Sequence, residues 1–96
     1  MSLLSLEIVT PHGRVLNEQD VAKVVVRRFE EHFEKGGQVV FLPCHGSETV
    51  HMGEGELLYV TEDGRQAHVA VNGGFAEIEQ DRVTVLTYAA QLAPPL

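Results

Sequence analysis

The stretch ELLYVTEDGRQAHVAV, residues 56–71, contains the clearest folding signal in the chain. Two β-rich runs, 56–61 and 65–71, flank the turn residues Glu62, Asp63 and Gly64. An Asp-Gly pair tolerates the positive φ angles that a tight hairpin turn needs. The two runs are therefore predicted to pair as antiparallel strands.

Similar runs recur on both sides of this hairpin and are separated by Gly, Pro, Asn and Asp. They lie at 4–9, 14–16, 21–28, 38–42, 48–52, 75–79 and 83–87. Short strands at intervals of roughly eight to twelve residues predict an all-β sandwich or barrel. Because Val24, Val25 and Val26 follow one another, the run at 21–28 is predicted to be a central strand. Gly73 and Gly74 are assigned to backbone geometry, as a bulge or a bend between sheets.

The segment near 29–35 interrupts the β pattern. Phe29 and Phe33 are four residues apart, as on one face of a helical turn, and charged residues stand between and after them. A short helical or irregular insert is predicted here. The two aromatic rings either tuck under the insert or contact a partner, and the sequence leaves both alternatives open.

Length and charge limit the function classes. The 96 residues allow one domain, predicted at 1–88, and the Pro94-Pro95 pair predicts a frayed tail over 89–96. Seven basic and fourteen acidic residues give a net charge of -7, which argues against a nucleic-acid partner. A single cysteine predicts a reducing compartment, and the absence of a long apolar run predicts no direct membrane insertion.

The polar residues do not form a recognisable catalytic pattern. His45 and His51 with Glu54 or Glu56 suggest a cupin-like metal site, but the close pair of histidines typical of that motif is missing. On a strand, neighbouring side chains point to opposite faces, which argues against a Cys44-His45 nucleophile. The sequence predicts no catalytic residue, metal, cofactor or small-molecule substrate. A cupin-like metal-binding protein and an adaptor sandwich remain as alternatives.

Three segments resemble the N-terminal domain of the epsilon subunit of F-type ATP synthases. They are LEIVTP at 6–11, FLPCHG at 41–46 and GGFAEIEQDRVTVL at 73–86. The resemblance implies a two-sheet β-sandwich of about ten short strands, and the number of predicted strands agrees. It also implies a noncatalytic rotor subunit that couples the gamma subunit to the membrane c-ring. Such a subunit would lie on the cytoplasmic face of the cell membrane, as a peripheral part of the complex.

The same resemblance implies two partner-binding sets. Thr10 and the loop residues Pro43, Cys44 and His45 match family positions that lie toward gamma. The acidic residues Glu30, Glu31 and Glu34 match the loop that faces the c-ring. Since ring loops in the family carry basic residues, these carboxylates are expected to orient docking by charge complementarity.

Overall fold

The computed structural model describes residues 2–29 and 37–93. These residues form seven strands: β1 (Leu4–Thr10), β2 (Gly13–Arg27), β3 (Gln38–Phe41), β4 (Glu48–Thr61), β5 (Gln66–Glu79), β6 (Arg82–Leu86) and β7 (Ala90–Leu92). The all-β prediction is confirmed. No helix occurs in this described part, and none long and apolar enough to cross a membrane was found there.

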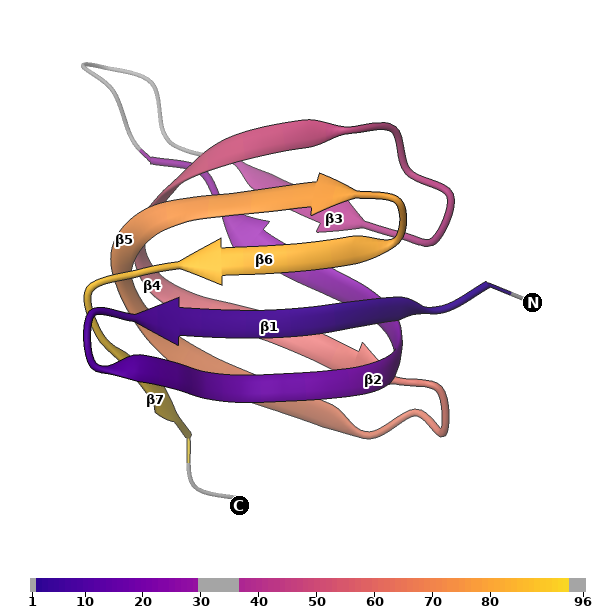
Figure 1. The fold of residues 1–96 in the computed structure, drawn as a ribbon, viewed down its shortest axis with the longest axis horizontal. Helices are drawn as coiled ribbons and strands as arrows, with labels where there is room; N and C mark the ends of the chain where they lie inside the picture. Colours follow the sequence, from indigo (N-terminus) through magenta and orange to yellow (C-terminus); the bar gives the residue numbers. More distant parts are fainter. Residues whose placement is uncertain (1, 30–36, 94–96) are drawn as a thin grey trace.

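Three long strands, β2, β4 and β5, run through both layers of the sandwich (Figure 1). In one layer β1 lies between the first half of β2 and a parallel β6, and β6 pairs with the second half of β5. In the other layer the second half of β2 lies between β3 and β4, and the first half of β5 pairs with β4 and β7. The run at 21–28 was predicted to be a central strand, and this is confirmed for residues 21–27, which form the second half of β2.

The long strands explain why the structure has seven strands and the sequence predicts about ten. The predicted runs are interrupted at 17–20, 53–55 and 72–74, but the backbone continues through each of these gaps as part of a strand. Asp20, Gly55, Gly73 and Gly74 have positive φ angles at these points, of 57°, 149°, 70° and 104°. Such residues bend a strand from one sheet into the other without ending it. Each long strand was therefore counted as two short ones.

Gly74 also permits a close approach between strands. A Cβ atom at this position would lie 1.9 Å from the carbonyl oxygen of Leu86 on β6. No side chain can be accommodated at that distance. The predicted backbone role of the Gly73-Gly74 pair is confirmed.

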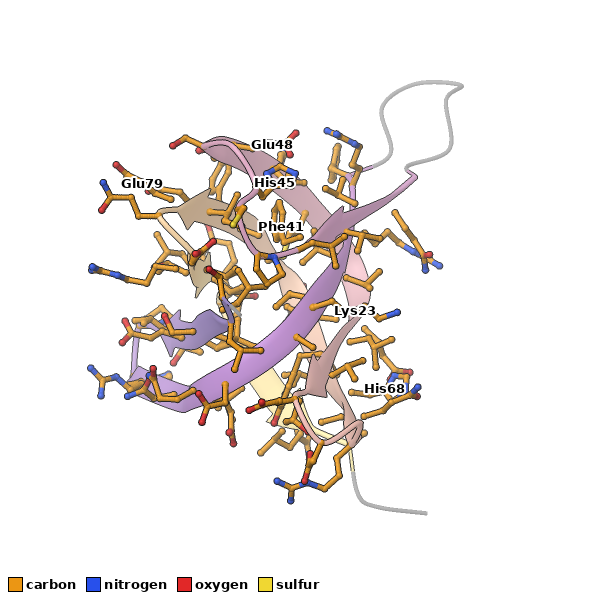
Figure 2. All side chains as sticks on the ribbon, turned by 90° about the vertical axis from the view of Figure 1, so that its right-hand side faces the viewer. Lys23, Phe41, His45, Glu48, His68 and Glu79 are labelled. Carbon is orange, nitrogen blue, oxygen red and sulfur yellow. The ribbon has the colours of Figure 1, made fainter. Side chains whose placement is uncertain are left out.

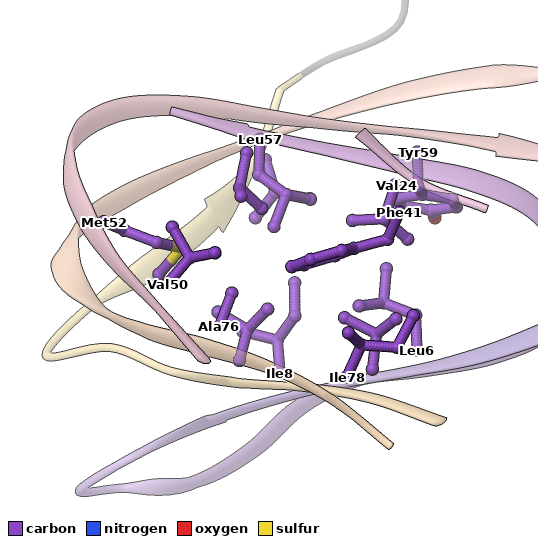
Figure 3. Close-up of a cluster of buried hydrophobic side chains, with 14 of the residues drawn as sticks. Leu6, Ile8, Val24, Phe41, Val50, Met52, Leu57, Tyr59, Ala76 and Ile78 are labelled. Atoms are coloured by element: carbon purple, nitrogen blue, oxygen red, sulfur yellow. The ribbon is translucent and has the colours of Figure 1, made fainter. Parts of the chain in front are cut away.

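The core is formed by the alternate side chains of all the main strands. Phe41 is fully buried at its centre, with Leu6, Ile8, Val24 and Met52 among the side chains drawn around it (Figure 3). Full burial of a Phe or Leu side chain contributes about 1.5–3 kcal/mol to the free energy of unfolding, so these buried side chains are the main source of the stability of the sandwich.

The predicted hairpin at 56–71 is confirmed, with β4 and β5 joined through residues 62–65. Gly64 has a φ of 88°, as the Asp-Gly turn requires. The Thr61 hydroxyl donates a hydrogen bond to the Asp63 carboxylate, and Arg65 Nε lies 3.0 Å from Asp63 Oδ2. These two hydrogen bonds, that of Thr61 first, lower the pKa of Asp63.

Two predictions concern the edges of the domain. The prediction of a frayed tail over 89–96 is wrong for residues 90–92, because Ala90–Leu92 pair with β5 as β7. Buried Thr87 leads into this strand, and its hydroxyl donates to the carbonyl of Ala89, 3.3 Å away. The helical or irregular insert lies outside the described residues except for Phe29, whose N–H donates to the His51 carbonyl across 2.8 Å.

Candidate partner-binding surfaces

The loop at 43–45 connects β3 to β4 and is fixed to a distant turn. Cys44 has a φ of 66°, and its N–H donates to Asp81 Oδ1 across 2.6 Å. Asp81 stands in the β5–β6 turn, where its carbonyl accepts from the Ser5 N–H at the start of β1. Pro43 is half-buried and Cys44 is exposed. The loop is therefore anchored but accessible.

His45 makes polar side-chain contacts from this loop. Its Nε2 lies 3.7 Å from Glu48 Oε1, and Glu48 Oε2 lies 3.5 Å from Arg28 Nη2. The imidazole also meets the ring of Phe41 edge-on, with centroids 5.5 Å apart. Figure 2 shows His45 and Glu48 together at one end of the molecule, with Phe41 below them. Glu48 thus connects the loop to the end of β2, from which the acidic insert begins.

Thr10 is the last residue of β1, at the end of this strand that lies away from Ser5. Its hydroxyl accepts a hydrogen bond from the His12 N–H and donates one to the Gly13 carbonyl, each at 3.2 Å, within the β1–β2 turn. Because the 43–45 loop is anchored beside Ser5, β1 separates the two predicted gamma-side elements. The structure does not bring Thr10 and the loop together.

The three predicted ring-facing residues, Glu30, Glu31 and Glu34, lie outside the described residues. The base of their segment is described. The Arg28 N–H donates to the carbonyl of Gly37 across 2.8 Å and so closes the connection between β2 and β3. Arg28 and Gly37, which flank the segment, are therefore adjacent.

A row of mostly apolar side chains, exposed except for half-buried Val9, crosses the outer face of the layer that contains β1 and β6. We call this the outer row, and its members, in spatial order, are Val9, Leu86, Phe75, His51 and Phe29. Strand pairing places each of the first three directly opposite the next. The His51 ring stacks on Phe75 at 5.0 Å and on Phe29 at 4.6 Å between centroids. The row is thus a continuous series of side chains.

A groove of about 580 Å³ follows the outer row. Its lining comprises Val9, Thr10, Pro11, His51, Gly74, Phe75, Leu86, Thr87 and Tyr88. Among the described residues, Thr10 is the predicted gamma-side residue that borders this groove, and His51, a donor of the alternative metal site, borders it too. Phe29 was predicted as a possible partner contact and His51 as an alternative metal ligand. Val9, Phe75 and Leu86 were not predicted, because they occupy the outward positions of strands identified by their buried residues. The available signal was the apolar character of Phe75 and Leu86, which stand where an alternating strand would carry polar side chains.

The donors of the alternative metal site are separated. His51 is stacked within the outer row, His45 faces Glu48, and Glu56 lies 3.3 Å from His68 Nδ1. Within residues 2–29 and 37–93, no three His, Cys, Asp or Glu side chains are grouped as an ion site would require. The described geometry therefore gives the cupin-like hypothesis no support.

Comparison with known proteins gives consistent results. Residues 3–93 match the model of the ATP synthase delta/epsilon chain β-sandwich domain. The ATP synthase epsilon chain of Nitratidesulfovibrio vulgaris is 41% identical over 90 residues, covering 94% of this chain and 61% of the relative. The epsilon chain of Geotalea uraniireducens is 38% identical over 92 residues, covering 94% and 59%. This chain thus spans about three fifths of the length of these relatives.

Solved structures show the same fold in larger assemblies. A chain of the Euglena gracilis mitochondrial ATP synthase, solved with OSCP, F1 and the c-ring, superposes with a TM-score of 0.80 at 22% identity. The match covers 94% of this chain and 53% of that one. A chain from the central stalk and c-ring of the Tetrahymena thermophila enzyme gives a TM-score of 0.70 at 10% identity, covering 94% and 66%.

Proposed function

Because this chain belongs to the ATP synthase delta/epsilon family, we propose that it is a noncatalytic subunit of the rotor's central stalk. It couples the gamma subunit to the membrane c-ring during ion-driven ATP synthesis or hydrolysis. The family match over residues 3–93 is the observation that carries this proposal. The subunit works as a rigid adaptor and lies on the cytoplasmic face of the membrane as a peripheral part of the complex.

The described structure supports a mechanical role. The sheet is continuous, and the three bent strands tie its two layers together covalently. A load applied to one layer is therefore carried into the other through backbone as well as through side-chain packing. The closely packed interior has low compressibility and transmits strain, as torque transfer requires.

Copurification tests whether this chain binds the gamma subunit. This chain, carrying an affinity tag, is coexpressed with the gamma subunit of the same organism, and the eluate is separated by gel filtration. We expect a one-to-one complex. Elution of this chain without gamma would contradict the proposal. A metal analysis of the purified protein is the matched test of the cupin-like alternative, which requires a stoichiometric metal that is lost on His51→Ala.

The gamma-side residues are proposed at two places, Thr10 by the groove and the loop of Pro43, Cys44 and His45. Since β1 separates them, gamma must either extend along the sandwich or use one place only. His45→Ala and Thr10→Ala test this in the copurification assay. A loss of complex with one variant alone identifies the place that gamma occupies, and wild-type behaviour of both variants contradicts the assignment.

The c-ring side is proposed at Glu30, Glu31 and Glu34. Reversal of all three to Lys should weaken copurification with the detergent-solubilised c-ring and make the remaining binding less sensitive to salt, because steering by opposite charge is screened by ions. A matched control reverses three carboxylates elsewhere, Glu18, Glu56 and Glu62. An unchanged salt profile in the first variant would contradict the electrostatic contact.

A further inference from the structure

The imidazole ring of His45 faces two hydrogen-bond acceptors. Its Nδ1 lies 2.6 Å from the carbonyl oxygen of Gly46, and its Nε2 lies 3.7 Å from Glu48 Oε1. Carbonyl oxygens and ionised carboxylates only accept hydrogen bonds, whereas a neutral imidazole has one N–H donor and one bare nitrogen. The contact with Gly46 uses the single N–H of the neutral ring, so the bare Nε2 faces the carboxylate. A second proton on the ring turns this unfavourable contact into an ion pair.

Three charged side chains surround this loop in the described structure. Glu48, the first residue of β4, faces the His45 ring with Oε1, and its Oε2 lies 3.5 Å from Arg28 Nη2 at the end of β2. Asp81, in the β5–β6 turn, accepts the hydrogen bond from the Cys44 N–H. The two cations use different oxygens of Glu48. A protonated His45 can therefore pair with Glu48 while Arg28 keeps its own contact.

The His45 side chain connects the loop to the sandwich at two points. The ring meets the buried ring of Phe41 edge-on, with centroids 5.5 Å apart, and reaches Glu48 on its other side (Figure 2). The backbone of the loop is held separately, because the His45 N–H donates to the Leu42 carbonyl across 3.2 Å and the Cys44 N–H donates to Asp81. The contact with Glu48 is the one of these that changes when the ring gains or loses a proton.

We propose that His45 is a proton-controlled latch for the loop at 43–46. With both ring nitrogens protonated, His45 forms an ion pair with Glu48 and ties the loop to β4. With one proton on the ring, this pair is lost, and the loop is held by its backbone hydrogen bonds and by packing on Phe41. Imidazole ordinarily changes its charge between about pH 5 and 8, so the latch closes and opens near neutral pH.

On the basis of the proposed function, the latch also prepares the loop for gamma. Pro43, Cys44 and His45 are the loop residues proposed to face that subunit. A segment that is already ordered loses less conformational entropy on binding. A fall in pH therefore orders the loop before gamma arrives. The latch itself belongs to this chain alone and is tested without gamma.

The test is nuclear magnetic resonance of the purified chain between about pH 5.5 and 7.5, a range in which histidine titrates and most carboxyl groups and thiols do not. Ring nitrogen shifts follow the charge and the tautomer of His45, and hydrogen exchange gives the protection factors of the Cys44 and His45 amides. Protection should fall about two- to fivefold as the pH rises, in parallel with the titration of the His45 ring, as loss of a partly exposed ion pair predicts.

A pair of variants identifies the carboxylate. Glu48→Gln removes the charge and keeps an acceptor oxygen, so protection of the loop amides should no longer depend on pH in this range. Glu56→Gln is the matched control, because Glu56 lies on the same strand and 3.3 Å from the Nδ1 atom of another histidine, His68. It should keep the pH dependence of the wild type.

Several outcomes would overturn the latch. Protection that stays constant in the wild type while the His45 ring titrates would show that the proton does not order the loop. A fall that persists in Glu48→Gln, or is lost in Glu56→Gln as well, would show that the Glu48 pair is not responsible. A neutral ring with its proton on Nε2 would contradict the contact with Gly46. None of these results bears on the proposed function, which copurification with gamma decides.

Discussion

Gly74 and Cys44 both adopt a positive φ angle, but their surroundings differ completely. Gly74, with a φ of 104°, faces the Leu86 carbonyl so closely that a Cβ atom would lie 1.9 Å from it. Cys44, with a φ of 66°, is exposed and is held by one hydrogen bond from its N–H to Asp81. At the first position both the backbone angle and the available space require glycine. At the second only the angle favours it.

Gly74 belongs to the scaffold of the sandwich, whereas Cys44 belongs to a loop that is proposed to contact gamma. The bend at Gly74 carries β5 from one layer to the other and places Phe75, the centre of the outer row, next in the chain. The Cys44 loop lies outside the sheet, where a side chain in an unfavourable conformation costs only about 1–2 kcal/mol. The substitutions below test this comparison, beginning with the largest expected effect.

Gly74→Ala is expected to lower the free energy of unfolding by about 3 kcal/mol or more. The cost combines a backbone conformation unfavourable to L-residues with a clash that must separate β5 from β6. Urea denaturation measures the change. The matched control is Gly64→Ala, because Gly64 also has a positive φ of 88° but nothing lies within 4 Å of its added Cβ. Equal losses in the two variants would show that the backbone angle, and not the close approach, makes Gly74 necessary.

Cys44→Val should destabilise the protein by about 1–2 kcal/mol, since a β-branched residue is poorly suited to a left-handed conformation. Cys44→Gly is the informative companion. It removes the strain and adds chain entropy to the unfolded state, so a change within about 0.5 kcal/mol is expected. Chemical denaturation compares the two. A Val variant as stable as the wild type would mean that the loop can relax away from the φ of 66°.

Asp81→Ala should cost about 1 kcal/mol, because the variant loses the hydrogen bond from the Cys44 N–H. Asp81→Asn keeps an acceptor oxygen and tolerates the φ of 60° at this position, so it should retain most of the stability. Amide hydrogen exchange at Cys44 supplies a local measurement. Faster exchange in the Ala variant alone is expected, and unchanged exchange in both variants would contradict the anchoring role of Asp81.

The sequence predicts the parts of this molecule that depend on local chemistry. The Asp-Gly hairpin follows from the φ preference of Gly64, and the strands follow from alternation of apolar and polar residues. The number of strands could not be derived in this way. A bend at Asp20 or Gly73 and a turn have the same residue types, and only pairing with neighbouring strands makes the backbone continue.

The candidate surfaces were predicted less completely for a similar reason. Thr10 and the loop of Cys44 and His45 came from resemblance, and the structure places them at opposite ends of β1. The outer row joins residues from β1, β4, β5 and β6 with Phe29, which are far apart in the chain. Such a row exists only once register is fixed, and one sequence does not fix the register of distant strands.

The smallest expected effect concerns Asp63 in the exposed hairpin turn. Hydrogen bonds from Thr61 and Arg65 lower the pKa of its carboxyl in the folded protein. The ionised form is therefore the one that the fold favours. Its contribution to stability is present above the unfolded pKa of about 3.9 and is lost as the pH falls through the lower, folded value.

Asp63→Asn cannot ionise, so on acidification from pH 6 to pH 2.5 its urea midpoint should fall slightly less than that of the wild type. Glu62→Gln, one residue earlier in the same turn, is the control and should follow the wild type; parallel curves for all three proteins would show that the Thr61 and Arg65 contacts do not persist in solution.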